Sequence, residues 1–212
     1  MGKNKVHTRY KLEDGTPIAG TTTIIGILAK PALINWAWKL GIEGIDYKKV
    51  RDTAGSIGTI AHYLIQCHLK EEKADLADYT QENIDKAKVA FNAFLDFEEQ
   101  HKLENILVEA QLIDTKLLYG GTIDFYGKVD GKLTLLDFKT GSGLWPEMRL
   151  QVAAYRNLLQ VNGHKVESVQ LLRIDKETGE FHHHMLNELS EAWHMFKLMI
   201  PVARLKKKIW KK

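Results

Sequence analysis

Charged residues interrupt two apolar stretches that are otherwise typical of buried strands. Asp124 lies in the sequence GTIDF, and Asp137 and Lys139 lie in LLDFKTG. Residues two apart on a strand share a face, so Asp137 and Lys139 point one way while their apolar neighbours point the other. A buried strand has no structural need for such charges. The pattern therefore indicates a site that binds a partner of opposite charge.

A short turn is expected to bring the two aspartates together. Asp130-Gly131 between the strands is a strong hairpin signal. The hairpin places Asp124 across from Asp137 to within about one residue of register. Two adjacent carboxylates repel each other unless a cation lies between them, and a hard divalent ion with oxygen ligands suits that role. We therefore expect Asp124 and Asp137 to be metal ligands.

Lys139 completes a set of groups suited to phosphodiester hydrolysis. A metal ion held by carboxylates lowers the pKa of bound water and polarises a phosphoryl oxygen. A nearby ammonium can orient or help deprotonate the attacking water, or neutralise charge that develops in the transition state. The alternative is a structural ion pair, but two acids with one base would leave a buried negative charge uncompensated, which is costly. Catalytic roles for Asp124, Asp137 and Lys139 are therefore favoured.

The segment WPEMRLQVAAYRNLLQ is expected to form the next helix. Gln151 and Tyr155 are separated by one helical turn and share a face, where they could order the site or the substrate. Arg149 lies near the helix start, where free backbone N–H groups favour a phosphate. Trp145, in the loop before the helix, could stack on a base. The alternatives are the polar edge of an amphipathic helix for Gln151 and Tyr155, and packing for Trp145.

Taken in this order, the motifs resemble the RecB-like branch of the PD-(D/E)XK nuclease superfamily. Asp124 matches the first acid of the family, and Asp137 with Lys139 matches its (D/E)xK pair. Gln151 and Tyr155 match the Gln-x-x-x-Tyr motif of the helix that follows. The likeness extends over residues 58–156. Each motif is weak alone, and their order makes the set specific.

The resemblance implies further metal ligands. GTIAH supplies His62 on an early helix, and LVEAQL supplies Glu109 on the strand before Asp124. Mg²⁺ or Mn²⁺ would then be held by His62, Asp124, Asp137 and the backbone carbonyl of Phe138, with Glu109 joining them. An imidazole ligand shifts the preference somewhat toward Mn²⁺. Without the other motifs, His62 would be an ordinary helix residue and Glu109 an exposed strand charge.

Three features limit which members of the superfamily this sequence resembles. Ile123 stands where the superfamily often has a proline, as is usual in the RecB-like branch. The single cysteine, Cys67, excludes a disulfide, a four-cysteine zinc site and a cysteine-held iron–sulfur cluster, and is expected to be a core residue on a helix. A helicase motor does not fit in this length. What remains resembles a stand-alone nuclease, and the region from Pro31 to Trp38 also resembles the N-terminal helix of small phage and organellar exonucleases of this branch.

The function that the resemblance implies is metal-dependent hydrolysis of DNA by an exonuclease acting on ends or single strands. DNA would be the partner, with replication or recombination proteins as further partners, in phage DNA metabolism, recombination or repair. One alternative is a structure-specific endonuclease of the same fold. Another is a nucleic-acid-binding module without activity, although such a module would be expected to have lost an acid or the lysine. Strand polarity and oligomeric state stay open.

Composition is typical of one compact domain spanning residues 1–212. The chain has 212 residues, 44% of them hydrophobic, and only 4 prolines. No apolar run approaches the ~18 residues that cross a bilayer, and the polar start does not resemble a signal peptide. We expect a soluble protein without membrane association in the cytoplasm of a bacterium or of a phage-infected host cell.

Periodicity predicts an α/β fold with a restriction-endonuclease-like mixed central sheet flanked by helices. Residues 1–105 are expected to be mainly helical, residues 106–187 to form the sheet core, and residues 188–212 to form a basic helix. Helices are expected over 31–41, 53–72, 81–102, 145–160 and 189–210, the last broken or kinked at Pro201. Strands are expected over 106–114, 119–129 and 132–141 as an antiparallel meander, then over 166–175 and 180–187 as a pair.

Other residues carry weaker signals. In FHHHM, His182 and His184 share a strand face that His183 does not, but exposed histidines are favoured over a metal site. Trp36 and Trp38 could stack on bases, with packing as the favoured role. The mild net charge of +3 conceals a basic C-terminal cluster, expected to be a solvated helix end, with phosphate binding as the alternative. The cluster comprises Arg204, Lys206, Lys207, Lys208, Lys211 and Lys212.

Overall fold

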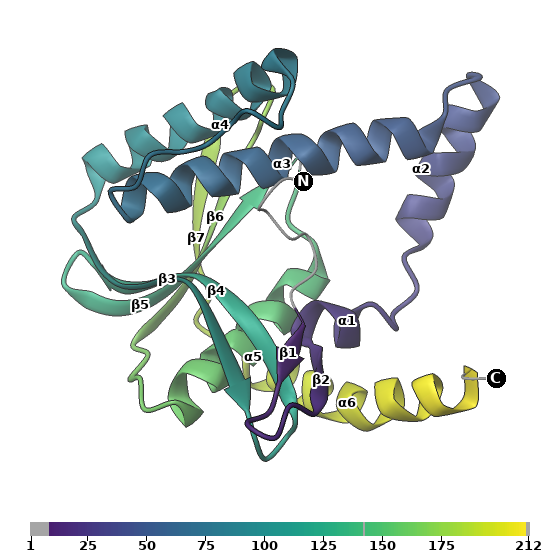
Figure 1. The fold of residues 1–212 in the computed structure, drawn as a ribbon, viewed down its shortest axis with the longest axis vertical. Coiled ribbons are helices and arrows are strands. Elements are labelled where there is room, and N and C mark those ends of the chain that lie inside the picture. Colours follow the sequence, from purple (N-terminus) through teal and green to yellow (C-terminus); the bar gives the residue numbers. More distant parts are fainter. Residues whose placement is uncertain (1–8, 142, 211–212) are drawn as a thin grey trace.

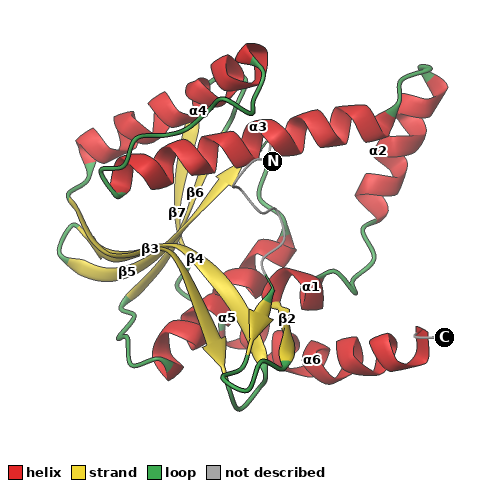
Figure 2. Cartoon of the chain, viewed as in Figure 1, coloured by secondary structure: helices red, strands yellow, loops and turns green. Residues whose placement is uncertain are grey.

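The computed structural model describes residues 9–141 and 143–210, which form a mixed sheet flanked by helices (Figures 1 and 2). The helices are α1 (Thr21–Ile25), α2 (Pro31–Ile42), α3 (Tyr47–Leu69), α4 (Gln81–Gln100), α5 (Pro146–Val161) and α6 (Ser190–Trp210). The strands are β1 (Tyr10–Lys11), β2 (Pro17–Gly20), β3 (Leu103–Asp114), β4 (Tyr119–Val129), β5 (Lys132–Thr140), β6 (Ser168–Ile174) and β7 (Phe181–Met185). Lys211 and Lys212 of the basic cluster lie outside the described residues.

The sheet has the strand order β1-β2-β4-β5-β6-β7, and β3 pairs with β4. Strand β2 runs parallel to β4, and β5 runs parallel to β6, whereas the other pairs are antiparallel. The helix α5 makes the crossover between the parallel strands β5 and β6. The mixed central sheet with flanking helices confirms the predicted fold class.

Two hydrophobic clusters hold the helices against opposite faces of the sheet. Helices α3 and α4 bury side chains such as Ile60 and Phe94 against Phe138 of β5. Helices α5 and α6 bury side chains such as Leu158 and Phe196 against the other face, where α1 also packs. Figure 1 shows this sandwich, with α3 and α4 above the sheet and α1, α5 and α6 below it.

Local signals correctly predicted several features. Asp130 and Gly131 both have positive φ angles, 51° and 82°, as a two-residue hairpin turn requires. Strands β3, β4 and β5 form the expected antiparallel meander. Cys67 is buried on helix α3, as expected for a core residue. No described helix has both the length and the apolar character that a membrane span requires.

Other features differ from the sequence-based expectations. Helix α3 begins at Tyr47, well before the predicted start at residue 53, and β3 begins at Leu103 rather than 106. The short strands β1 and β2 and helix α1 were not expected in the segment predicted to be mainly helical. Helix α6 runs through Pro201 without a break, so of the two expected outcomes, a break or a kink, the break was wrong. Buried Phe196 and Ile200 hold the helix against the core just before the proline.

One edge of strand β4 pairs with two different strands, and the change of partner falls near the middle of the strand. Along one edge it pairs with β3, whereas the other edge pairs with β2 at Tyr119 and Gly120 and with β5 only from Phe125 onward. At this point the strand also contributes to both hydrophobic clusters. Ile123 packs with the cluster of α5 and α6, and Phe125 packs with the cluster of α3 and α4. Asp124 lies between them, so the fold places it where β4 and β5 separate.

Candidate active site

The fork between β4 and β5 brings the two aspartates together. Phe125 pairs with Leu136 at the end of the ladder, so Asp124 and Asp137 occupy the next opposed positions. The Asp124 carboxylate accepts a hydrogen bond of 2.9 Å from the Phe138 backbone N–H. This bond links the diverging strands and fixes the direction of the Asp124 side chain. The expected cross-strand placement of the two acids is confirmed.

Three side chains from different elements form a group that could hold a metal ion. His62 of α3, Glu109 of β3 and Asp124 of β4 each offer a ligand atom, and these atoms lie within 4.8 Å of one another. His62 Nδ1 is 3.7 Å from Asp124 Oδ2. Imidazole and carboxylate donors at such separations fit a divalent ion after small side-chain movements.

A glycine lets α3 come close enough to deliver His62. A Cβ added at Gly58, one turn before His62, would lie 2.8 Å from the Thr140 hydroxyl oxygen at the end of β5. A side chain at this position would therefore require either the Thr140 side chain or the helix to shift. The His62 ring also makes an edge contact with Phe138, with 6.2 Å between centroids. Helix α3 is thereby held over the strand that carries Asp137.

Glu109 occupies its position at the cost of backbone strain. Its φ angle is +50°, in the left-handed region that disfavours residues with a Cβ, although its neighbours Val108 and Ala110 pair normally with β4. Glu109 lies opposite Asp124 on the adjacent strand, and no cap or turn requires the conformation. Strain of this kind concentrates at functional sites. The backbone here directs the Glu109 carboxylate toward Asp124 and His62.

Asp137 is the most deeply buried charged group of the site. Its side chain is 0% exposed and contacts the Lys139 ammonium, which confirms that these residues point the same way. Apart from that contact, no described residue donates a hydrogen bond to either carboxylate oxygen. Burial raises the pKa of Asp137 to about 6, opposed mainly by Lys139. Buried oxygens without donors leave coordination capacity for a cation.

Burial also shifts the pKa values of other ionisable groups of the site. Burial lowers the pKa of His62 to about 4, assisted by the Lys139 charge and opposed by Asp137. Burial raises the pKa of Glu109 to about 7, with a further contribution from the Asp124 charge. Burial also raises the pKa of Asp124, opposed by Lys139. The raised pKa values mean that these carboxyl groups favour their neutral forms. A bound cation would allow them to be ionised at the same time.

Helix α5 contributes a polar pair. The Gln151 side-chain amide donates a 2.9 Å hydrogen bond to the Tyr155 hydroxyl. The Tyr155 ring packs against Gly121 of β4, three residues before Asp124. Burial raises the pKa of Tyr155 well above its usual value, and the charges of Asp137 and Asp124 raise it further. The shared helical face expected for Gln151 and Tyr155 is therefore present, and it faces the fork.

Among the described residues, neither Arg149 nor Trp145 forms a hydrogen bond or ion pair with this group. The Arg149 guanidinium donates a 2.6 Å hydrogen bond to the Glu188 carbonyl, which ties the start of α5 to the segment before α6. Trp145 precedes α5 and is 54% exposed. Arg149 is thus occupied by a structural bond, and the Trp145 ring lies open to solvent.

Tyr10 lies beside the site but was not predicted from the sequence. The Tyr10 hydroxyl is 2.8 Å from the Thr122 hydroxyl, and its ring lies so close to Gly120 that an added Cβ would be 2.5 Å from it. The nearby Glu109 charge contributes to the raised pKa of Tyr10, after burial as the main cause. Strand β1 has two residues and pairs only with β2, so the local sequence offers no signal that Tyr10 reaches the site.

Close packing at the fork predicts a sensitive glycine. A Cβ at Gly121 would lie 2.6 Å from the Tyr155 ring and 2.8 Å from Leu158. We expect Gly121→Ala to displace Tyr155 and to lower the free energy of unfolding by roughly 1–3 kcal/mol, as overpacking does. Urea denaturation measures this change. The control is Gly41→Ala, since an added Cβ there meets no atom within 4 Å; equal stability of the two variants would contradict the packing argument.

The weaker candidates remain apart from the group. His182 and His184 stack with 6.2 Å between centroids, and neither belongs to a metal-ligating group among the described residues. Trp36 packs edge-on against Tyr47, whereas Trp38 is 66% exposed. In the basic cluster, Arg204 donates hydrogen bonds to the carbonyls of Leu117 and Leu118, while Lys206, Lys207 and Lys208 are exposed.

Comparisons with known proteins agree with the fold. No protein-family model matches the chain, and a search of curated proteins gave no match. A candidate exonuclease from Eubacterium rectale has a TM-score of 0.55 at 12% identity, over 74% of this chain and 69% of that chain. LHK-Exo, solved with dAMP, gives 0.42 at 12% identity, over 74% and 86% of the two chains, a likeness too low to support an argument. The first likeness shows that this chain shares the fold of a candidate exonuclease.

Proposed function

We propose that this protein is a metal-dependent DNA nuclease that hydrolyses phosphodiester bonds. The observation that carries the proposal is the placement of His62, Glu109 and Asp124 in one metal-sized group, with the Asp137–Lys139 pair beside it at the fork. The shared fold with a candidate exonuclease supports it. The RecB-like branch of the PD-(D/E)XK superfamily is the placement that the motifs favour, and an exonuclease acting on ends or single strands is the corresponding activity.

The donor set fits Mg²⁺ or Mn²⁺. His62, Asp124 and Glu109 would hold the ion. Asp137 lies outside that group, but its carboxylate oxygens lack hydrogen-bond donors among the described residues, and we propose it and the Phe138 carbonyl as further oxygen ligands. A divalent ion bound there would supply a Lewis acid for a phosphoryl oxygen and a water of lowered pKa. The one nitrogen ligand favours Mn²⁺ over Mg²⁺ modestly.

The remaining side chains have roles that follow from their positions. Lys139 contacts Asp137, and its ammonium can orient a water or offset negative charge that develops on the phosphoryl group. The hydrogen bond between Gln151 and Tyr155 fixes a polar wall beside the acids, against which a DNA strand can be ordered.

A time course on end-labelled DNA tests the proposal. Linear single-stranded DNA, linear duplex and closed circles are each incubated with wild type and with Lys139→Ala, in Mg²⁺, Mn²⁺ or EDTA. We expect metal-dependent loss of linear DNA that the substitution abolishes. Cutting of circles would replace the exonuclease with an endonuclease. Binding without cleavage in every metal would leave the inert nucleic-acid-binding module.

Metal affinity is expected to fall as the pH is lowered. A carboxylate binds a metal ion only when it is deprotonated, and the pKa values of Glu109 and Asp137, about 7 and about 6, lie above the usual range. His62, with a pKa of about 4, stays neutral above pH 5 and does not add to the effect. Between pH 7.5 and 5.5 the Mn²⁺ affinity should drop by about tenfold per pH unit for each proton displaced.

Calorimetric titration with Mn²⁺ across this range measures the dependence. Glu109→Gln removes the group with the higher pKa, so its affinity should change less than that of wild type between pH 6.5 and 7.5. An affinity independent of pH in wild type would show that these carboxyl groups are not the ligands.

A further inference from the structure

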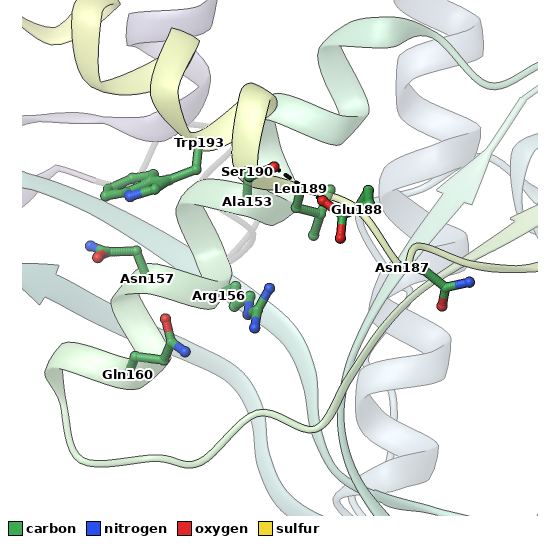
Figure 3. Close-up of a pocket in the computed structure, with 9 residues that line it drawn as sticks. All are labelled: Ala153, Arg156, Asn157, Gln160, Asn187, Glu188, Leu189, Ser190 and Trp193. Atoms are coloured by element: carbon green, nitrogen blue, oxygen red, sulfur yellow. Dashed lines mark hydrogen bonds between the residues drawn. The ribbon is translucent and has the colours of Figure 1, made fainter.

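A hollow lies between α5 and the start of α6 (Figure 3). Its volume is about 270 Å³. Residues that line it include Arg156, Asn157 and Gln160 of α5, and Glu188 and Trp193 at the α6 side. Polar side chains line the hollow together with apolar ones such as Trp193, so it can hold a ligand that has both a polar head and a less polar body.

The hollow is separate from the candidate active site. Gln151 and Tyr155 are hydrogen-bonded on the face of α5 that packs against Gly121 of β4, whereas Arg156 and Gln160 line the hollow. At about 3.6 residues per turn, these two pairs lie on opposite sides of the helix axis. The body of α5 therefore stands between the two sites, and a ligand in the hollow has no direct contact with the metal group.

Arg156, which lines this hollow, has a buried hydrogen-bond donor without an acceptor in the described part of the chain. Its Nε is buried and has no hydrogen-bond partner, and no described residue forms a hydrogen bond or ion pair with its guanidinium. The nearby Arg149 differs, because it is satisfied by the Glu188 carbonyl. A buried donor without an acceptor is rare and costly unless a ligand or water completes it. In Figure 3 the Arg156 guanidinium lies between α5 and the Glu188 segment.

The surroundings of Arg156 favour an oxyanion. The planar guanidinium binds phosphate through paired hydrogen bonds. Ser190 and Leu189 place the first turn of α6 at the rim, where backbone N–H groups without intrahelical partners favour negative charge. Gln160 and Asn187 add amide groups that make no side-chain hydrogen bond among the described residues.

We propose that the hollow between α5 and α6 binds a phosphate group through Arg156. The group could belong to a free nucleotide or to the end of a nucleic acid strand, because both present the same dianionic head. The volume exceeds that of one phosphate, which leaves room for an attached sugar. Glu188 opposes binding through its charge, although its carboxylate is turned to the Ser190 hydroxyl at 3.1 Å and forms no ion pair with Arg156.

Binding is tested in EDTA, so that neither metal nor nuclease activity is needed and failure of the proposed function leaves the result unaffected. Inorganic phosphate, dAMP, and a short DNA strand with or without a 5′-phosphate are titrated while the Trp193 indole N–H is followed by NMR. We expect Arg156→Ala to weaken phosphate binding by about tenfold or more, and Arg156→Lys to weaken it less. Glu188→Gln should strengthen it.

The matched control is Arg51→Ala, which removes the same charge from an exposed arginine of α3 paired with Asp52. It should leave phosphate binding unchanged. Dependence of strand binding on both the 5′-phosphate and Arg156 would identify a nucleic acid end, and dependence for dAMP and phosphate alone would identify a free nucleotide. Phosphate binding that is absent in wild type, or equal in wild type and Arg156→Ala, would overturn the proposal.

Discussion

Asp124→Asn is expected to reduce metal-dependent DNA hydrolysis by about 10³-fold or more, the scale at which loss of one preorganised charged group acts on a reaction. Asparagine has nearly the same size, and its side-chain oxygen can still accept the hydrogen bond from the Phe138 N–H. The fork between β4 and β5 should therefore persist. What disappears is the charge that, with Glu109 and His62, would hold the ion.

The rate is measured on labelled linear DNA at saturating Mn²⁺, alongside Mn²⁺ affinity and the free energy of unfolding. We expect lower affinity and unchanged or higher stability, because the substitution removes a like charge beside Asp137. Asp96→Asn, on the exposed side of α4, makes the same chemical change away from the site and should be neutral. A rate within about tenfold of wild type would remove Asp124 from the catalytic set.

Glu109→Gly should make the protein more stable and less active. Glycine adopts the φ of +50° without the left-handed penalty, so we expect a gain of roughly 1–2 kcal/mol in the free energy of unfolding. Loss of the carboxylate from the metal group should reduce DNA hydrolysis by roughly 10²-fold, as removal of one group that stabilises the transition state does. Denaturation and initial-rate measurements on the same preparation test both effects.

Two variants separate strain from charge. Glu109→Gln retains the strained backbone and removes the charge, so it should lose activity and lack the part of the stability gain that comes from relaxing the backbone. Glu71→Gly relaxes a comparable φ of 56° at an exposed position after α3, so it should gain stability without losing activity. If Glu109→Gly were destabilising, the strand geometry would not be the source of strain. If it retained full activity, Glu109 would have no role in hydrolysis.

The Asp137–Lys139 pair and the metal group depend on different features of the fold. Asp137 and Lys139 are two residues apart on one strand, and their contact follows from strand geometry alone. His62, Glu109 and Asp124 come from three elements, and their proximity depends on the close approach of α3 at Gly58 and on the strained backbone of β3. Substitutions at the packing positions should therefore disturb the metal group more than the Asp137–Lys139 pair.

The sequence by itself determined the features that local physics encodes. Alternating apolar residues gave β4 and β5, and Asp130-Gly131 gave the turn that sets their register. That register alone made Asp124 and Asp137 neighbours. The helical spacing of Gln151 and Tyr155 likewise predicted a shared face. Such features are recoverable because their partners are close in the chain or because a short repeat fixes the direction of each side chain.

The tertiary structure alone decided what depends on contacts between distant segments. The two-residue strand β1 has no pattern of its own, and Tyr10 is placed by packing on Gly120 and bonding to Thr122, more than a hundred positions away. The positive φ of Glu109 and the unpartnered Arg156 are equally invisible in the sequence. Neither side-chain type nor spacing records how one element presses on another, so strain, burial and unused hydrogen-bond donors emerge only when the chain is packed.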